Sequence, residues 1–136
     1  MRLMASAAGR ILIVDDDAAL LKVMDIYLSR LGYRVDACRN AADAWALVEA
    51  SPSLYAGALV DLNMPGMRGE ELARRILKCN ASIRLVVMSG YPAQPSAETV
   101  GGNRVGFLYK PFAPHELAEA LEGGLPNVRL LTRAAP

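Results

Sequence analysis

Acidic side chains follow two separate apolar runs in this sequence. Asp15–Asp17 come directly after one run, and Asp61 comes directly after another. Carboxylates that are brought together raise each other's pKa values unless a cation neutralises them. Oxygen ligands with room for water suit Mg²⁺, which takes one or two protein carboxylates and completes its octahedron with water and phosphate oxygens. These residues therefore predict a magnesium site.

A hydroxyl and an ammonium group follow two later apolar runs, at Ser89 and Lys110. An ammonium group can pair with Asp61 and then with a phosphoryl oxygen, while a hydroxyl donates to the same group. Phosphoryl transfer depends mainly on positioning and charge neutralisation around an in-line nucleophile. Asp61 is the predicted nucleophile, which would form an acyl phosphate.

Each of these residues also has a purely structural interpretation. Asp15–Asp17 suit the start of a helix, where a cap and acidic residues stabilise the first turn by roughly 0.3–1 kcal/mol. Ser89 would then be an ordinary strand-end hydroxyl, and Lys110 a solvated surface lysine. Their shared position after predicted strands favours the functional interpretation.

The elements that must position these residues alternate along the chain from Arg10 onward. Short β-rich runs alternate with helix-period segments, a pattern typical of a parallel sheet with helices on both faces. The functional residues of such a doubly wound sheet lie at the carboxyl ends of its strands. The five predicted strands are Ile11–Val14, Tyr33–Cys38, Ala56–Val60, Arg84–Met88 and Gly106–Tyr109.

Helical spacing or capping signals mark the segments between and after the strands. The stretch Pro92–Arg104 is rich in Pro and Gly, so it predicts only a short or distorted fourth connecting helix around Ser96–Val100. The other predicted helices cover Leu20–Leu31 with Gly32 as its stop, the segment from the Asn40 cap to Ser51, Arg68–Cys79, and a last helix beginning at Pro114.

Composition indicates one globular domain. The chain has 136 residues, is 53% hydrophobic and 21% charged, and carries a formal net charge of +1, which gives no basic footprint for nucleic acid or an anionic membrane. Cys38 and Cys79 form no zinc or disulfide pattern. No apolar run reaches membrane-spanning length and no signal peptide is evident, so we expect a cytoplasmic protein. The expected organisation is an N-terminal extension (1–9), one domain (10–123) and a C-terminal tail (124–136).

Taken together, the motifs resemble the receiver domain of two-component response regulators. The resemblance runs from about Arg10 to Gly123. It implies a flavodoxin-like, doubly wound α/β fold with five parallel strands in the order 2-1-3-4-5. The matching stretches are Ile11–Asp17, Leu59–Gly69, Met88–Gly90 and Tyr109–Phe112.

The resemblance also implies a role for each site residue. Asp61 would accept a phosphoryl group from a sensor histidine kinase or a phosphotransfer protein. Asp15, Asp16, Asp61 and the backbone carbonyl of Asn63 would hold Mg²⁺ or Mn²⁺.

Further roles follow for residues around the phosphoryl group. Ser89 would be the switch hydroxyl and Lys110 the phosphate-pairing lysine, with a cis peptide bond before Pro111. Phe107 matches an aromatic residue that turns inward on activation, although simple core packing would also account for it.

Two features depart from the common family pattern. Tyr91 places a bulky ring two residues after Ser89, where it would screen water from the phosphoryl group, so we expect Tyr91 and Asn63 to tune a slow dephosphorylation. The Pro- and Gly-rich stretch Pro92–Arg104 lies in a region that the family often uses for output. Ser89–Tyr91 also resembles receivers fused to sensor kinases, so a receiver excised from such a kinase is one reading of the chain.

The predicted function is a phosphoacceptor module that switches contacts with an unknown downstream protein, with a homodimer as one possible form. It would have no enzyme activity beyond its own phosphorylation and dephosphorylation. The alternatives are a receiver-like scaffold that is not phosphorylated, a hydrolase of the haloacid-dehalogenase type, and a flavin carrier. The hydrolase class has a second Asp where Asn63 stands, and Asp15–Asp17 would repel a flavin phosphate.

Overall fold

The computed structural model describes residues 9–90 and 105–122 of the chain. Within these residues the strands are β1 (Arg10–Val14), β2 (Arg34–Cys38), β3 (Tyr55–Asp61), β4 (Arg84–Ser89) and β5 (Gly106–Tyr109). The helices are α2 (Ala18–Arg30), α3 (Ala41–Ala50), α4 (Gly69–Cys79) and α6 (Pro114–Glu122).

The strands form one parallel sheet in the order β2-β1-β3-β4-β5. This is the order that the resemblance implied. β1, β3 and β4 occupy the centre, and they are nearly pure apolar runs because helices cover both of their faces. From β1 the chain moves outward to β2 and then returns past β1 to β3, so the strand order changes direction between β1 and β3. The carboxyl ends of these two strands are therefore the expected place for a site.

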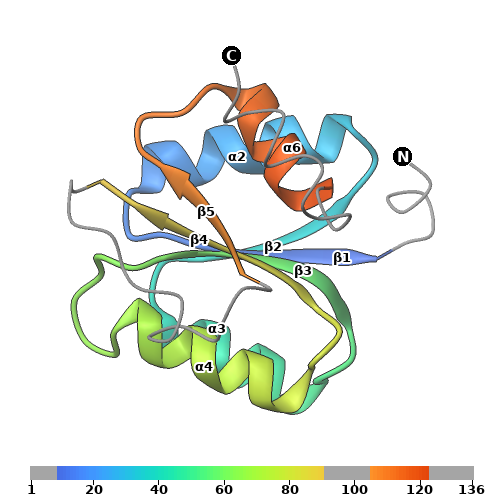
Figure 1. The fold of residues 1–136 in the computed structure, drawn as a ribbon, viewed down its shortest axis with the longest axis vertical. Coiled ribbons are helices and arrows are strands. Elements are labelled where there is room, and N and C mark those ends of the chain that lie inside the picture. Colours follow the sequence, from blue (N-terminus) through green and yellow to red (C-terminus); the bar gives the residue numbers. More distant parts are fainter. Residues whose placement is uncertain (1–8, 91–104, 123–136) are drawn as a thin grey trace.

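Two helical layers enclose the sheet. Figure 1 shows α2 and α6 on one face and α3 and α4 on the other. Each layer has its own apolar cluster, because successive strand residues point to opposite faces. Leu12, Val14 and Val60 face α3 and α4, whereas Ile13 and Leu59 face α2 and α6.

The helix boundaries follow from local signals in the sequence. Gly32 has a φ of 104°, a left-handed conformation that glycine adopts without steric cost just after α2. The Asn40 side chain accepts a hydrogen bond from the Asp43 amide at the start of α3. Leu72 and Ile76, the predicted core contacts of α4, are fully buried.

Differences from the predicted elements are small. β3 runs through Asp61 and β4 through Ser89, so both residues lie in the ladder itself rather than after it. Arg68 is the N-cap of α4 rather than its first residue. The predicted helix around Ser96–Val100 lies outside the described residues. Among the residues that are described, no helix is long and apolar enough to span a membrane.

Candidate functional site

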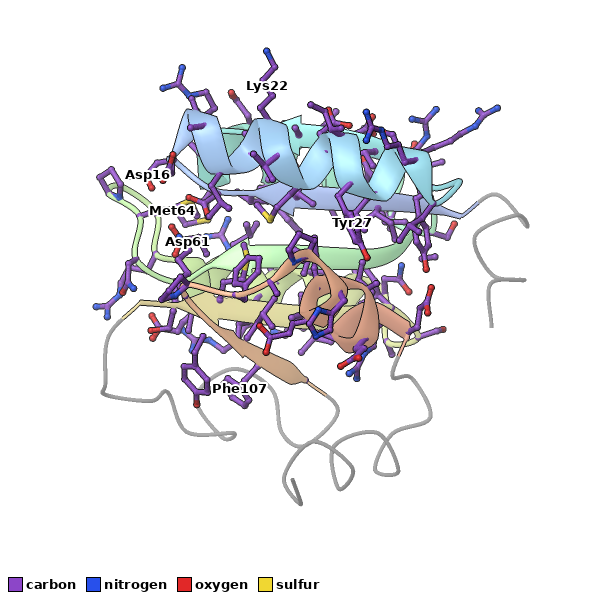
Figure 2. All side chains as sticks on the ribbon, turned by 90° about the horizontal axis from the view of Figure 1, so that it is seen from above. Asp16, Lys22, Tyr27, Asp61, Met64 and Phe107 are labelled. Atoms are coloured by element: carbon purple, nitrogen blue, oxygen red, sulfur yellow. The ribbon has the colours of Figure 1, made fainter. Side chains whose placement is uncertain are left out.

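Three carboxylates meet where β1 and β3 end. The two strands are parallel neighbours with Val14 opposite Val60, so the residues that follow, Asp15 and Asp61, lie side by side. Asp16 joins them, and the three residues offer carboxylate oxygens that lie within 4.8 Å of one another. Figure 2 shows Asp16 and Asp61 together at this end of the sheet.

Lys110 brings a positive charge to the cluster. Its Nζ lies 2.9 Å from Oδ2 of Asp15 and 3.5 Å from Oδ2 of Asp61. Its backbone amide donates to the carbonyl of Ser89, which fixes the start of the loop after β5 against the end of β4. The peptide bond between Lys110 and Pro111 is cis, as the resemblance implied.

Burial governs the electrostatics of the site. Asp61 is 2% exposed, and burial together with the nearby Asp15 raises its pKa, against the opposing effects of the Asn63 amide and Lys110. Burial by itself would lower the pKa of Lys110, but the carboxylates of Asp15 and Asp61 outweigh it and raise that pKa. The lysine therefore stays charged while Asp61 carries a costly negative charge.

The residues fit a hard divalent cation. Oδ2 of Asp15 is fully buried, and its close contact is the ion pair with Lys110 Nζ at 2.9 Å. The same ammonium also faces Oδ2 of Asp61, so it neutralises only part of this buried negative charge. Three carboxylates also exceed the charge that one ammonium neutralises. Asp15, Asp16 and Asp61 are thus a suitable ligand set for Mg²⁺.

The residues Asp15–Asp17 serve both as a helix cap and as part of the acidic cluster. Asp17 is the N-cap of α2, and its carboxylate accepts hydrogen bonds from the amides of Ala19 and Leu20. Oδ1 of Asp15 accepts the Asp17 amide, which leaves Oδ2 directed at Lys110. The capping interpretation therefore holds for Asp17, while Asp15 and Asp16 join Asp61.

Of the other predicted site residues, Ser89 and Asn63 contact residues of the cluster, whereas Phe107 does not. Ser89 is buried at the end of β4, opposite Tyr109 and in backbone contact with Lys110. Asn63 is exposed, and its amide donates to Oδ1 of Asp61. Phe107 is not part of the cluster: it packs against the core on the α3 and α4 side, and Figure 2 shows it apart from Asp61. Tyr91 lies outside the described residues.

Sequence reasoning missed two residues of the loop that follows Asp61. Met64 is buried in the apolar cluster on the α3 and α4 side, and Figure 2 labels it at the same end of the sheet as Asp16 and Asp61. Gly69 lies directly against the backbone of Asp61 and Leu62. An apolar side chain within a turn-rich loop was the available signal for Met64, whereas the contact of Gly69 arises only from tertiary packing.

The chain matches the response regulator receiver domain family over residues 11–122. It is 33% identical over 119 residues to the transcriptional regulatory protein FixJ of Bradyrhizobium diazoefficiens, covering 86% of this chain and 57% of that protein. Across the curated relatives compared, the chain spans between 27% and 57% of their length.

Solved structures agree with this match. A CheY-like receiver domain protein from Methanospirillum hungatei has a TM-score of 0.75 at 30% identity and covers 87% of this chain and 94% of its own. A receiver protein from Sinorhizobium medicae has a TM-score of 0.79 at 27% identity and covers 90% of this chain and 97% of its own. The sheet order, the acidic cluster and the family match lead to one conclusion: this chain belongs to the response-regulator receiver domains of two-component signalling systems.

Proposed function

We propose that Asp61 is the phosphoacceptor, and that it receives a phosphoryl group from a phosphohistidine of a sensor histidine kinase or phosphotransfer protein. One observation carries the proposal. The buried Asp61 carboxylate lies within 4.8 Å of Asp15 and Asp16 and 3.5 Å from the Lys110 ammonium. This combination of a nucleophile, an acidic pair and a fixed cation matches the needs of phosphoryl transfer.

The two oxygens of Asp61 differ in their partners. Oδ1 accepts the Asn63 amide, whereas Oδ2 faces Lys110, so we assign Oδ2 as the attacking atom. Its O–P bond forms as the P–N bond to the donor imidazole breaks, and that electron pair stays on the ring nitrogen, which takes up a proton. Lys110 then pairs with a phosphoryl oxygen, and the Ser89 hydroxyl donates to another.

Asp15, Asp16, Asp61 and the backbone carbonyl of Asn63 would hold Mg²⁺ or Mn²⁺. When bound, the ion neutralises the charge that builds up on the phosphoryl oxygens. The buried Oδ2 of Asp15, whose negative charge Lys110 neutralises only in part, supports this assignment.

Output would pass through protein contacts. Ser89 would move toward the phosphoryl group, and Phe107, which is only partly buried, would turn inward and change the surface offered to a downstream protein or a second copy of the chain. Asn63 and Tyr91 would set the rate at which water removes the phosphoryl group. We expect all of this to take place in the cytoplasm.

The test is incubation with a small phosphodonor, acetyl phosphate, followed by intact mass spectrometry. We expect the mass of one phosphoryl group on the wild type in Mg²⁺, none after chelation, and none on Asp61→Asn. Lys110→Ala removes the ammonium that pairs with the phosphoryl group, so we expect it to label more slowly than the wild type. Its matched control is Lys22→Ala, because Lys22 is exposed on α2 and Figure 2 shows it directed away from Asp61. Labelling of Asp61→Asn equal to that of the wild type would refute the assignment.

A scaffold that is never phosphorylated is not favoured, because its site would have no reason to keep costly buried charge. The raised pKa of Asp61, caused first by burial and then by Asp15, is a cost in stability that a purely structural role does not repay. Failure of the wild type to take up phosphate, and also to bind the phosphoryl mimic beryllium fluoride with Mg²⁺, would reverse this judgement.

A further inference from the structure

Gly69, the first residue of α4, makes a backbone contact that none of the site chemistry uses. A methyl group built on it would lie 2.6 Å from Cα of Leu62 and 3.0 Å from the carbonyl carbon of Asp61, and closer still to the Asp61 carbonyl oxygen. Real Cβ atoms essentially never approach a backbone atom to under 3.0 Å. Any side chain at this position would therefore force either α4 or the Asp61–Leu62 backbone to move.

α4 cannot move away from the sheet without opening its own core contacts. Leu72, Ala73 and Ile76 on its inner face are fully buried, in the same apolar cluster as Leu62 and Met64. Protein interiors are close-packed and transmit strain instead of absorbing it. A side chain at Gly69 would therefore displace mainly the Asp61–Leu62 backbone.

The Asp61–Leu62 backbone is directly connected to the site. The Leu62 amide donates to the carbonyl of Met88 over 2.9 Å, and the Asn63 amide donates to Oδ1 of Asp61 over 3.1 Å. A shift of the Asp61–Leu62 peptide would therefore re-aim the Asp61 carboxylate and move the Asn63 carbonyl. Misplacement of a reacting group by about 1 Å can cost on the order of 100-fold in rate.

We infer that Gly69 is a positioning residue for Asp61: its missing side chain lets the first turn of α4 lie against the Asp61–Leu62 backbone and hold the carboxylate in its reactive place. The inference rests on the proposed function of Asp61. It extends that function to a residue that touches neither the phosphoryl group nor the metal.

The test compares Gly69→Ala with Gly57→Ala. Gly57 lies in β3, the strand that carries Asp61, four residues before it and so roughly 13 Å away along the strand. A methyl group there would meet the side-chain ends of Ile11 and Leu121 at 3.0 and 3.1 Å and the carbonyl oxygen of Arg84 at 3.3 Å. Both variants strain the core, but only Gly69→Ala strains the phosphoacceptor.

Two readouts are taken on protein shown to be folded by urea denaturation, with sucrose added where needed to favour the compact state. The first is the rate of labelling by acetyl phosphate per folded molecule. The second is the Mg²⁺ dissociation constant from calorimetry, which needs no phosphorylation. We expect Gly69→Ala to lose 10- to 100-fold in rate, on the scale given for a 1 Å misplacement, and to bind Mg²⁺ more weakly. Gly57→Ala should keep both values within about two-fold of the wild type while also losing stability.

Equal rates and equal Mg²⁺ affinities for the two variants would overturn the inference. It would also be overturned if Gly69→Ala failed to fold in sucrose where Gly57→Ala folds, because the close approach would then serve the fold as a whole. A wild type that binds Mg²⁺ but takes up no phosphate would count against the proposed function instead, and weaker Mg²⁺ binding by Gly69→Ala would still support the positioning role.

Discussion

Asp61 is held where its negative charge is unfavourable until a cation arrives. Burial is the main cause of its raised pKa, and the charge of Asp15 adds to the effect. Lys110 offsets part of this cost but serves two carboxylates at once. Active sites often retain such strain because the same arrangement assists the reaction.

Replacing Asp61 should therefore stabilise the protein in a pH-dependent way. Below the ordinary pKa of 3.8 the carboxyl is protonated in both the folded and unfolded states, so it contributes no penalty. As the pH rises through the raised pKa, the buried carboxyl ionises at a free-energy cost and the folded state loses stability. We expect Asp61→Asn to be more stable than the wild type at pH 7 without Mg²⁺, and equal to it below about pH 3.8.

Urea denaturation across pH measures this difference. Asp43→Asn is a suitable control, because Asp43 is exposed on α3 and does not belong to the acidic cluster. An Asp61→Asn advantage that persists undiminished in acid, or that is missing at pH 7, would contradict the electrostatic account.

The residue types and their positions after strands were enough to predict Asp15, Asp16, Asp61, Ser89 and Lys110 as a group. Carboxyl ends of parallel strands meet at one edge of a sheet, so pattern alone brings such residues together. Met64 and Gly69 could not be found this way, because their roles depend on how the loop after β3 folds back on the sheet. The loop turns at Gly66, whose φ of 82° is a tertiary outcome that the sequence only permits.

The start of α2 adjoins the acidic cluster: its N-cap, Asp17, directly follows Asp15 and Asp16, the proposed metal ligands. Asp17 accepts two amides of the first turn, whereas Asp16 contributes an oxygen to the acidic cluster. Sequence alone left the capping and metal-binding interpretations open, because three aspartates in a row satisfy both.

Alanine substitutions should separate these two roles. Asp17→Ala removes the cap and should lower the free energy of unfolding by about 0.5–2 kcal/mol while leaving Mg²⁺ binding intact. Asp16→Ala should remove most of the stabilisation by Mg²⁺, which for a ligand at 100 times its dissociation constant is about 2.7 kcal/mol. Urea denaturation with and without Mg²⁺ measures both effects, and equal losses of Mg²⁺ binding in the two variants would show that the division is wrong.

The two faces of α2 should also differ sharply. Met24 and Leu28 are buried against the sheet, whereas Val23 is 54% and Ile26 45% exposed. We expect Met24→Ala to cost about 2–5 kcal/mol and Val23→Ala less than about 0.5 kcal/mol in free energy of unfolding. A large loss for Val23→Ala would mean that this face is covered in the folded protein.

At the scale of the whole molecule, the five strands and their order followed from the alternation of apolar runs and from the family resemblance. Central strands are covered on both faces, so they appear in the sequence as nearly continuous apolar runs. The stretch Pro92–Arg104 gave the weakest pattern, and it falls outside the described residues. The predicted domain limits of 10–123 stay a prediction.

The chain spans at most 57% of the curated relatives compared, so what it shares with them is the receiver domain itself. Its net charge of +1 offers no strong field to attract nucleic acid.

To test whether Asp61 is the phosphoacceptor, we would locate the phosphoryl group on the chain. After phosphorylation by acetyl phosphate in Mg²⁺, borohydride reduces an aspartyl phosphate to homoserine, and peptide mass spectrometry identifies the reduced residue. We predict homoserine at position 61 alone, and only when Mg²⁺ was present during phosphorylation. Homoserine at Asp15 or Asp16, or phosphate retained on Ser89 with Asp61 unmodified, would contradict it.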